Sequence, residues 1–270
     1  MRINKLFSNL GICSRKETNK LIEQKRIKVN GEYCVLGQWV EDNDEILFDG
    51  ESVKSMEKVY LAFYKPRGIT CTLEKNAHGN IGEYINYHQY VFPVGRLDKD
   101  SEGLIILTND GVFSNHILEC DNKHEKEYIV KVDKPFDDNF LLSMRSGVEI
   151  SAKSGSGVKR ISDSEGIVIK EGKDEIIMLD EAKNGKMKKD IVKTRPCKVE
   201  RINEDTFKII LTQGLNRQIR NMSSVLGYKV ISLKRIRIMN IHLDYLECGE
   251  YRLIPKEHID ELMKTNYKNT

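Results

Sequence analysis

The feature that most constrains this chain of 270 residues is a polar break at residues 51–58. The break lacks the periodic apolar pattern by which a helix or strand buries one face. Strand-like sequence begins directly after it, at Val59. We therefore predict two domains, a small one at residues 1–50 and a larger one at residues 59–265, joined by a linker at residues 51–58.

The small domain is expected to hold two helices followed by a small sheet. Apolar residues at helical spacing predict helices at 2–10 and 15–25. Ser14 and Glu17 have the spacing of a capping box at the start of the second helix. Asn30-Gly31 is typical of a two-residue hairpin turn, because both residues tolerate a positive φ. Short strands are expected around this turn, at residues 27–29, 34–36 and 45–48.

The larger domain mixes strands and helices without the regular alternation of βαβ units. This order predicts an α+β fold with a mostly antiparallel mixed sheet. Strands are expected at residues 59–64, 103–107, 128–132, 206–211 and 234–243. Helices are expected at residues 112–119, 137–145, 216–226 and 255–264. Residues 151–193 are rich in Lys, Gly, Ser, Asp and Glu, which predicts a surface insertion.

Basic residues are concentrated in two parts of a chain whose net charge is only +3. Residues 1–30 hold eight Lys or Arg against two acids, and residues 214–237 hold six against none. Such concentrations indicate surfaces that bind a polyanion. For one patch alone, a basic face that is merely solvated is an equally good interpretation.

Cysteine, histidine and hydropathy patterns exclude several other classes of protein. The six cysteines lie far apart and the six histidines lack ligand spacing, so we expect neither a disulfide framework nor a metal site. No apolar run approaches the roughly 20 residues that span a bilayer. The first residues lack the apolar core of a secretory signal. We therefore expect a cytoplasmic protein without a membrane partner.

A charged loop before an apolar strand is the strongest candidate for chemistry. The sequence VGRLDKDSEG, which carries Arg96, Asp98, Asp100 and Glu102, precedes the run LIIL. Loops that lead into a central strand often hold catalytic groups. An ordinary exposed loop has the same composition, however. Composition alone favours the ordinary loop and does not distinguish its three acids.

Residues 2–50 resemble the S4 RNA-binding domain, which presents its helix pair and the following hairpin to folded RNA. The resemblance implies that five basic side chains face RNA: Arg15, Lys16, Lys20, Arg26 and Lys28. Each phosphate contact releases counterions, so binding should weaken steeply with salt.

The segment GRLDKDSEGLIILTNDG resembles the active-site motif of the pseudouridine synthases of the RsuA/RluF type. Further segments match this family in the same order along the chain, KPRG at 65–68, HEKEY at 124–128 and GLNRQIR at 214–220. The resemblance implies isomerisation of uridine to pseudouridine in structured RNA, with no metal or organic cofactor. The segments look most like those of family members that act on 23S ribosomal RNA. We expect a monomer.

The resemblance also implies roles for individual residues. Asp98 becomes the essential carboxylate, which either attacks C1′ of the ribose or removes the 2′ proton. A guanidinium would keep it ionised, and Arg220 is the first choice for this partner, with Arg217 second. Both arginines belong to the expected helix at 216–226, which Asn216 would cap.

Three more residues complete the expected site. Tyr128 would stack on the target base and help to move a proton. Arg96 would fill the space that the flipped uridine leaves in its helix. Lys65 would shape the site or contact phosphate, although the KPRG segment is equally well interpreted as a structural turn.

Alternative functions follow from the same sequence. The chain could be a non-catalytic RNA-binding factor in ribosome assembly that shares this fold, or it could act on 16S ribosomal RNA or tRNA. A methyltransferase or aminoacyl-tRNA synthetase with an S4 domain is disfavoured, because no glycine-rich loop follows a strand as nucleotide cofactors require.

Overall fold

The computed structural model describes residues 1–74, 77–85, 87–118, 124–152 and 190–264. The N-terminal domain has two helices, α1 (Ile3–Asn9) and α2 (Arg15–Glu23), as expected. Ser14 and Glu17 form the capping box at the start of α2, which confirms that prediction. The apolar faces of both helices pack on a small antiparallel sheet. Its strands are β1 (Ile27–Val29), β2 (Glu32–Tyr33), β3 (Ile46–Phe48) and β4 (Glu51–Ser52).

The hairpin at Asn30-Gly31 is confirmed, since both residues have positive φ and Val29 pairs with Glu32 across the turn. The strand expected at 34–36 is wrong. β2 ends at Tyr33, and the chain turns away at Leu36, where the side chain is exposed. β4 pairs with β3, so the first two residues of the expected 51–58 linker belong to this sheet.

The larger domain is built on one mixed sheet with the order β11-β12-β8-β13-β7-β5-β15. β6 also pairs with β7, and β14 with β13. β7 and β13 run parallel, whereas the other described pairs of this sheet are antiparallel, which confirms the expected fold class. The strands are β5 (Tyr60–Lys65), β6 (Phe92–Val94), β7 (Glu102–Thr108), β8 (Lys126–Val132), β11 (Lys198–Arg201), β12 (Thr206–Leu211), β13 (Val230–Ile238), β14 (Ile241–His242) and β15 (Tyr251–Leu253).

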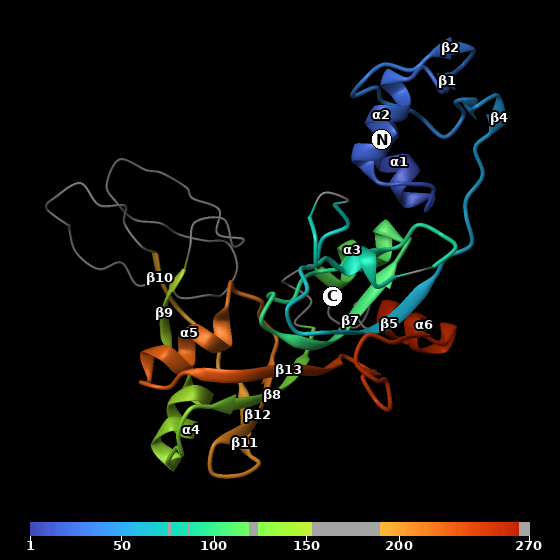
Figure 1. Ribbon diagram of the computed structural model, residues 1–270. Coiled ribbons are helices and arrows are strands. Elements are labelled where there is room, and N and C mark those ends of the chain that lie inside the picture. The colour runs from blue at the N-terminus through green and yellow to red at the C-terminus, as the bar shows by residue number, and fades with distance from the viewer. Residues whose placement is uncertain (75–76, 86, 119–123, 153–189, 265–270) are drawn as a thin grey trace, which may run out of the picture.

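Helices cover this sheet in two groups (Figure 1). The four expected helices are confirmed within two residues: α3 (Gly111–Leu118), α4 (Asp138–Ser146), α5 (Gln218–Val225) and α6 (Lys256–Lys264). Side chains of α4 and α5 form one apolar core with β8, β12 and β13, and those of α3 and α6 form a second with β5 and β7. None of the helices in the described part of the chain has the length and apolar character needed to cross a membrane.

β7 explains the apolar run that follows the charged loop. Leu104 and Ile106 pack in the core with α3 and α6, while Ile105 and Leu107 pack in a third core on the opposite face. A strand buried on both faces needs a continuous apolar run.

Two expectations about longer segments need correction or fall outside the described residues. The bounds of the strand expected at 234–243 are wrong. β13 already starts at Val230, and a turn at Met239, with φ 51°, separates it from the short strand β14. The insertion expected at 151–193 begins and ends in a strand pair, β9 (Glu149–Ala152) with β10 (Asp190–Lys193). Residues 153–189 lie outside the described part of the chain.

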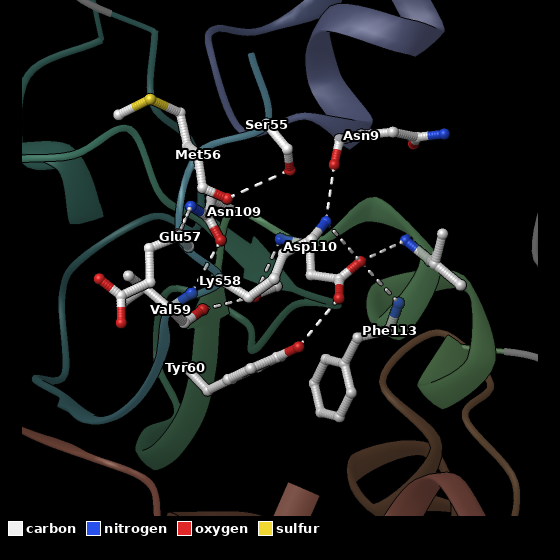
Figure 2. A network of polar contacts seen from close by, with 12 residues as sticks. Asn9, Ser55, Met56, Glu57, Lys58, Val59, Tyr60, Asn109, Asp110 and Phe113 are labelled. Atoms are coloured by element: carbon white, nitrogen blue, oxygen red, sulfur yellow. Dashed lines mark hydrogen bonds and ion pairs between the residues drawn. The ribbon is translucent and has the colours of Figure 1, made fainter. Parts of the chain in front are cut away.

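A polar network fixes the chain where the two domains meet (Figure 2). The buried Asn109 accepts a hydrogen bond from the Val59 amide at 2.9 Å and donates to the Glu57 carbonyl at 2.8 Å. Lys58 pairs with Asp110 at 3.4 Å and also donates to the carbonyl of Asn9, at the end of α1, at 2.7 Å. The end of the linker is therefore held by the larger domain, and one of its lysines contacts the N-terminal domain.

Candidate active site

A cavity of about 240 Å³ opens between the loop before β7, strand β8 and the segment that leads into α5. Four side chains singled out from the sequence line it: Arg96, Asp98, Tyr128 and Arg217. They come from three distant segments. The main sheet brings these segments together, because β7, β13 and β8 are neighbours in it.

The loop that carries Asp98 is fastened on both sides of this residue. Before it, the amide of Leu97 donates to Sγ of Cys71 at 3.3 Å, and Sγ donates back to the Leu97 carbonyl at 3.4 Å. After it, the carbonyl of Lys99 accepts a hydrogen bond from the amide of Gly68 at 2.7 Å. The segment around the KPRG sequence thus supports the backbone on either side of Asp98.

Lys65 belongs to this support and not to a surface that contacts RNA. Its side chain is completely buried, with 0% exposed. Nζ donates to the carbonyl oxygens of Pro66 and Ile69 at 2.7 and 2.8 Å, and burial lowers the pKa of the ammonium group. The prediction that Lys65 contacts RNA phosphate is therefore wrong, because both contacts of its ammonium group lie inside the protein.

Two arginines, one just before α5 and one within it, contact the loop that carries Asp98, where Arg220 alone was expected to pair with Asp98. Arg217 Nη1 lies 3.6 Å from Oδ2 of Asp98, and its Nη2 lies 3.2 Å from Oδ2 of Asp100. Arg220 Nη2 instead donates to the Asp100 carbonyl at 3.0 Å and to Ser101 Oγ at 3.3 Å. The choice of Arg220 as the direct partner of Asp98 is therefore wrong. Arg217 makes that ion pair, and Arg220 holds the loop backbone.

The start of α5 explains this division. The helix begins at Gln218, and the residue before it, Arg217, has left-handed backbone angles of φ 51° and ψ 34°. Asn216 therefore does not cap the helix as expected, and no side chain does so. The left-handed region is uncommon for residues other than glycine, and the apolar pattern of the helix gives no sign of it. Arg217 thus meets the loop from the turn that precedes α5.

The three acids of the loop differ in their surroundings. Of the three, Asp98 lines the cavity in the described structure, whereas Asp100 and Glu102 do not. Glu102 accepts a hydrogen bond from the Tyr64 hydroxyl at 3.3 Å. Burial alone would raise the pKa of Asp100, but the hydrogen bond and charge of Arg217 outweigh it and keep that pKa below its usual value. A ligand in the cavity would therefore meet Asp98.

Tyr128 and Arg96 contribute different kinds of surface. Tyr128 is half-buried on β8, where it pairs with Ile209 of β12 and Arg235 of β13. Arg96 is exposed and lines the same cavity. An aromatic ring and a solvated cation beside a carboxylate suit a ligand that combines a flat base with phosphate.

The basic side chains of the N-terminal domain lie outside this cavity. Arg15, Lys16 and Lys20 are exposed on α2, and Lys16 also approaches Glu74 at 3.4 Å. Arg26 pairs with Asp49, whereas Lys28 lies 4.9 Å from the ring centre of Tyr33. Among the described residues, no group of three or more His, Cys, Asp or Glu side chains is placed to hold a metal ion.

Comparison with known proteins matches both domains. A family model described as RNA pseudouridylate synthase matches residues 59–224, and one described as S4 domain matches residues 1–46. The dual-specificity RNA pseudouridine synthase RluF of Escherichia coli (strain K12) is 38% identical over 267 residues, which are 98% of this chain and 79% of that protein. The chain belongs to the RNA pseudouridine synthases.

Other relatives of this synthase agree. The ribosomal large subunit pseudouridine synthase B of Bacillus subtilis (strain 168) is 27% identical, over 97% of this chain and 95% of that protein. A crystal structure of a pseudouridylate synthase matches with a TM-score of 0.61 and 25% identity, over 97% of this chain and 99% of that one. Both matches span the two domains together.

Two residues at the site of this synthase were not singled out from the sequence. The Sγ of Cys71 exchanges hydrogen bonds with the backbone of Leu97, the residue before Asp98. Arg235 lines the cavity and is only 4% exposed. The sequence did contain a signal for Arg235. In the expected strand at 234–243, Arg235 and Arg237 alternate with isoleucines, so one face of that strand carries positive charge. No local signal marks Cys71, whose contact joins segments 26 residues apart.

Proposed function

We propose that this synthase isomerises a specific uridine in structured ribosomal RNA, most directly 23S ribosomal RNA, and that Asp98 acts on the ribose. The observation that carries the proposal is the position of Asp98 in the cavity wall, with Arg217 at 3.6 Å. The name of the Bacillus subtilis relative supports a substrate in the large ribosomal subunit. The S4 domain supports a folded RNA.

Both routes open to Asp98 need an ionised carboxylate. In one, an Asp98 oxygen bonds to C1′ while the C1′–N1 bond breaks; in the other, the carboxylate removes the 2′ proton and a glycal forms as uracil leaves. Uracil then rotates and C5 bonds to C1′, as the Asp98 oxygen leaves C1′ on the first route or as Asp98 returns the proton to C2′ on the second. C5 finally loses its proton and N1 gains one. Arg217, whose Nη1 lies 3.6 Å from Oδ2 of Asp98, would hold the carboxylate in place at the start of either route.

The remaining side chains of the cavity suit a flipped nucleotide. The Tyr128 ring would stack on the target base, and its hydroxyl would assist proton movement. Arg96, exposed beside the same cavity, would occupy the gap left in the RNA helix and offset part of the cost of flipping. Arg220 would act through the loop backbone as a positioning residue.

The N-terminal domain would bind RNA next to the target. Arg15, Lys16 and Lys20 project from α2 into solvent and would contact phosphates, together with Arg26 just before β1 and Lys28 on β1. That the synthase acts as a monomer stays a prediction. A ribosomal RNA substrate suits the cytoplasm.

The proposal is tested by mapping pseudouridine in total RNA from cells with and without this protein. Loss of the protein should remove pseudouridine from one or a few positions of 23S ribosomal RNA. The wild-type chain and Asp100→Asn should restore it, and Asp98→Asn should not. An unchanged map in every RNA would contradict the proposal. The name of the Escherichia coli relative, dual-specificity, makes a second RNA an alternative that the same map would reveal.

A further inference from the structure

Arg235 is a buried cation in the wall of the cavity, and the chemistry described above does not use it. It lies on β13 directly opposite Tyr128 of β8, so the two side chains share one face of the sheet. Both line the cavity, and Arg235 is 4% exposed. Its guanidinium therefore lies deeper than those of Arg96, which is exposed, and Arg217, whose side chain is 42% exposed.

The guanidinium of Arg235 is incompletely used by the protein. Nε donates to the Leu104 carbonyl at 2.7 Å, whereas Nη2 is buried and has no hydrogen-bond partner among the described residues. No acid in the described part of the chain pairs with it. A buried cation without a counter-charge destabilises the fold. Such a group is retained when its partner arrives with the ligand.

We propose that Arg235 donates a hydrogen bond to a carbonyl oxygen of the target uracil and stabilises the charge that uracil gains as its glycosidic bond breaks. The inference rests on the proposed function. When the C1′–N1 bond breaks, its electron pair stays with uracil and spreads over N1, O2 and O4. A fixed, buried cation stabilises this charge without reorganising. After rotation, the C5–C1′ bond forms as the Asp98 oxygen leaves C1′ or as Asp98 returns the proton to C2′; C5 then loses its proton and N1 is protonated.

Depth in the cavity favours the base over the phosphate as the partner of Arg235. The phosphates of a flipped nucleotide stay near the mouth, where Arg96 and Arg217 are exposed, while the base enters farthest. Arg235 shares its face of the sheet with Tyr128, the ring proposed to stack on that base. If the 4-thiouridine probe identifies O4 as the acceptor, the same donor also selects uracil, because cytosine carries an amino donor at that position.

The test is a double-mutant cycle on the full-length synthase. The probe is an oligoribonucleotide that spans the mapped uridine and carries uridine, 2-thiouridine or 4-thiouridine at that position. Sulfur accepts a hydrogen bond more weakly than oxygen does. Replacing a carbonyl oxygen by sulfur therefore weakens binding to Arg235 only if that oxygen accepts the hydrogen bond. Single-turnover rates are compared for wild type, Arg235→Gln and Arg235→Lys. Arg237→Gln is the matched control, since Arg237 lies on the same strand, pairs with Glu125 and Glu127, and does not line the cavity.

We expect Arg235→Gln to slow the single-turnover step about 100-fold while RNA binding changes less than about threefold. One of the two thio substitutions should slow wild type and Arg237→Gln about tenfold relative to the uridine RNA. Arg235→Gln should react with the same thio RNA as fast as with the uridine RNA. Arg235→Lys, which keeps the charge, should recover part of the rate. If Arg235→Gln does not fold, the same comparison is made with Arg235→Met, which also removes the guanidinium.

Equal thio effects in wild type and the Arg235 variants would overturn the inference and leave Arg235 as a link between β13 and β7. That result is separate from failure of the proposed function. If the proposed function fails, the wild-type synthase forms no pseudouridine in the mapped RNA segment.

Discussion

Lys65 and Arg235 are both buried cations close to the loop that carries Asp98, but their hydrogen-bond donors differ in whether the protein supplies a partner. The Lys65 ammonium donates to two carbonyl oxygens of the turn that follows β5. Nη2 of Arg235 has no partner among the described residues. A buried donor that is satisfied contributes to stability, whereas one that is left over costs free energy unless a ligand uses it. Substitution of Lys65 should therefore mainly lower the free energy of unfolding. Substitution of Arg235 should mainly lower the rate of catalysis.

Lys65→Met tests this division at the residue scale. Methionine fills similar space but leaves the carbonyl oxygens of Pro66 and Ile69 without their donor. We expect the free energy of unfolding to fall by about 2–3 kcal/mol in a denaturant titration. RNA affinity of the folded protein should change less than about twofold. Lys256→Met, at an exposed position of α6, is the control. Weaker RNA binding with unchanged stability would restore Lys65 as an RNA contact.

At the scale of elements, the parallel contact between β7 and β13 brings Arg235 to the loop that carries Asp98. Gly103 makes this contact possible. Its φ is +104°, and a Cβ there would lie 2.2 Å from the carbonyl oxygen of Arg235. Only glycine adopts this conformation readily while another backbone approaches so closely.

Gly103→Ala should separate the two strands. We expect a loss of at least about 2 kcal/mol in the free energy of unfolding, because the new methyl group meets backbone and the left-handed φ adds strain. Gly214→Ala is the matched control, since a Cβ there meets nothing within 4 Å. Thermal unfolding of both variants checks the prediction. Equal stability of Gly103→Ala and wild type would mean that the strands do not approach as described.

Elements with a strong local pattern were predictable from the sequence, and those set by distant contacts were not. The bounds of β12 match the expected residues 206–211, and Ser14 caps α2 as its spacing with Glu17 predicted. The left-handed Arg217 was missed, because it depends on how the chain enters α5 and not on helical periodicity. The roles of Lys65 and Arg217 depend on which segments the sheet brings together, which a single sequence does not specify.

At the scale of the whole molecule, the linker connects an RNA-binding domain to the cavity through fixed contacts. Tyr60 donates to Asp110 at 2.9 Å, and Asp110 also accepts hydrogen bonds from the amides of Val112 and Phe113 at the start of α3. These bonds, with those of Asn109, hold the end of the linker against the catalytic domain. Phosphate contacts of the N-terminal domain should therefore contribute affinity without altering the chemical step.

Replacing both Arg15 and Lys20 by alanine tests that expectation. The double variant should bind ribosomal RNA more weakly, and its plot of log affinity against log salt should be shallower by about 1.5, because two phosphate contacts are lost. The single-turnover rate at saturating RNA should stay within about twofold of wild type. Replacing Lys256 and Lys264 on α6 by alanine removes the same charge elsewhere and should not change the slope. An unchanged slope in the Arg15 and Lys20 variant would contradict an RNA-binding role for α2.

The most direct measurement is the single-turnover rate of pseudouridine formation by purified Asp98→Asn and Asp100→Asn on the mapped RNA segment. Both acids meet Arg217, but of the two only Asp98 lines the cavity in the described structure. We predict that Asp98→Asn loses at least about 10³-fold in rate while binding the RNA normally, since asparagine acts neither as nucleophile nor as base. Asp100→Asn should stay within about tenfold of wild type. An Asp98→Asn enzyme as active as wild type would contradict the account.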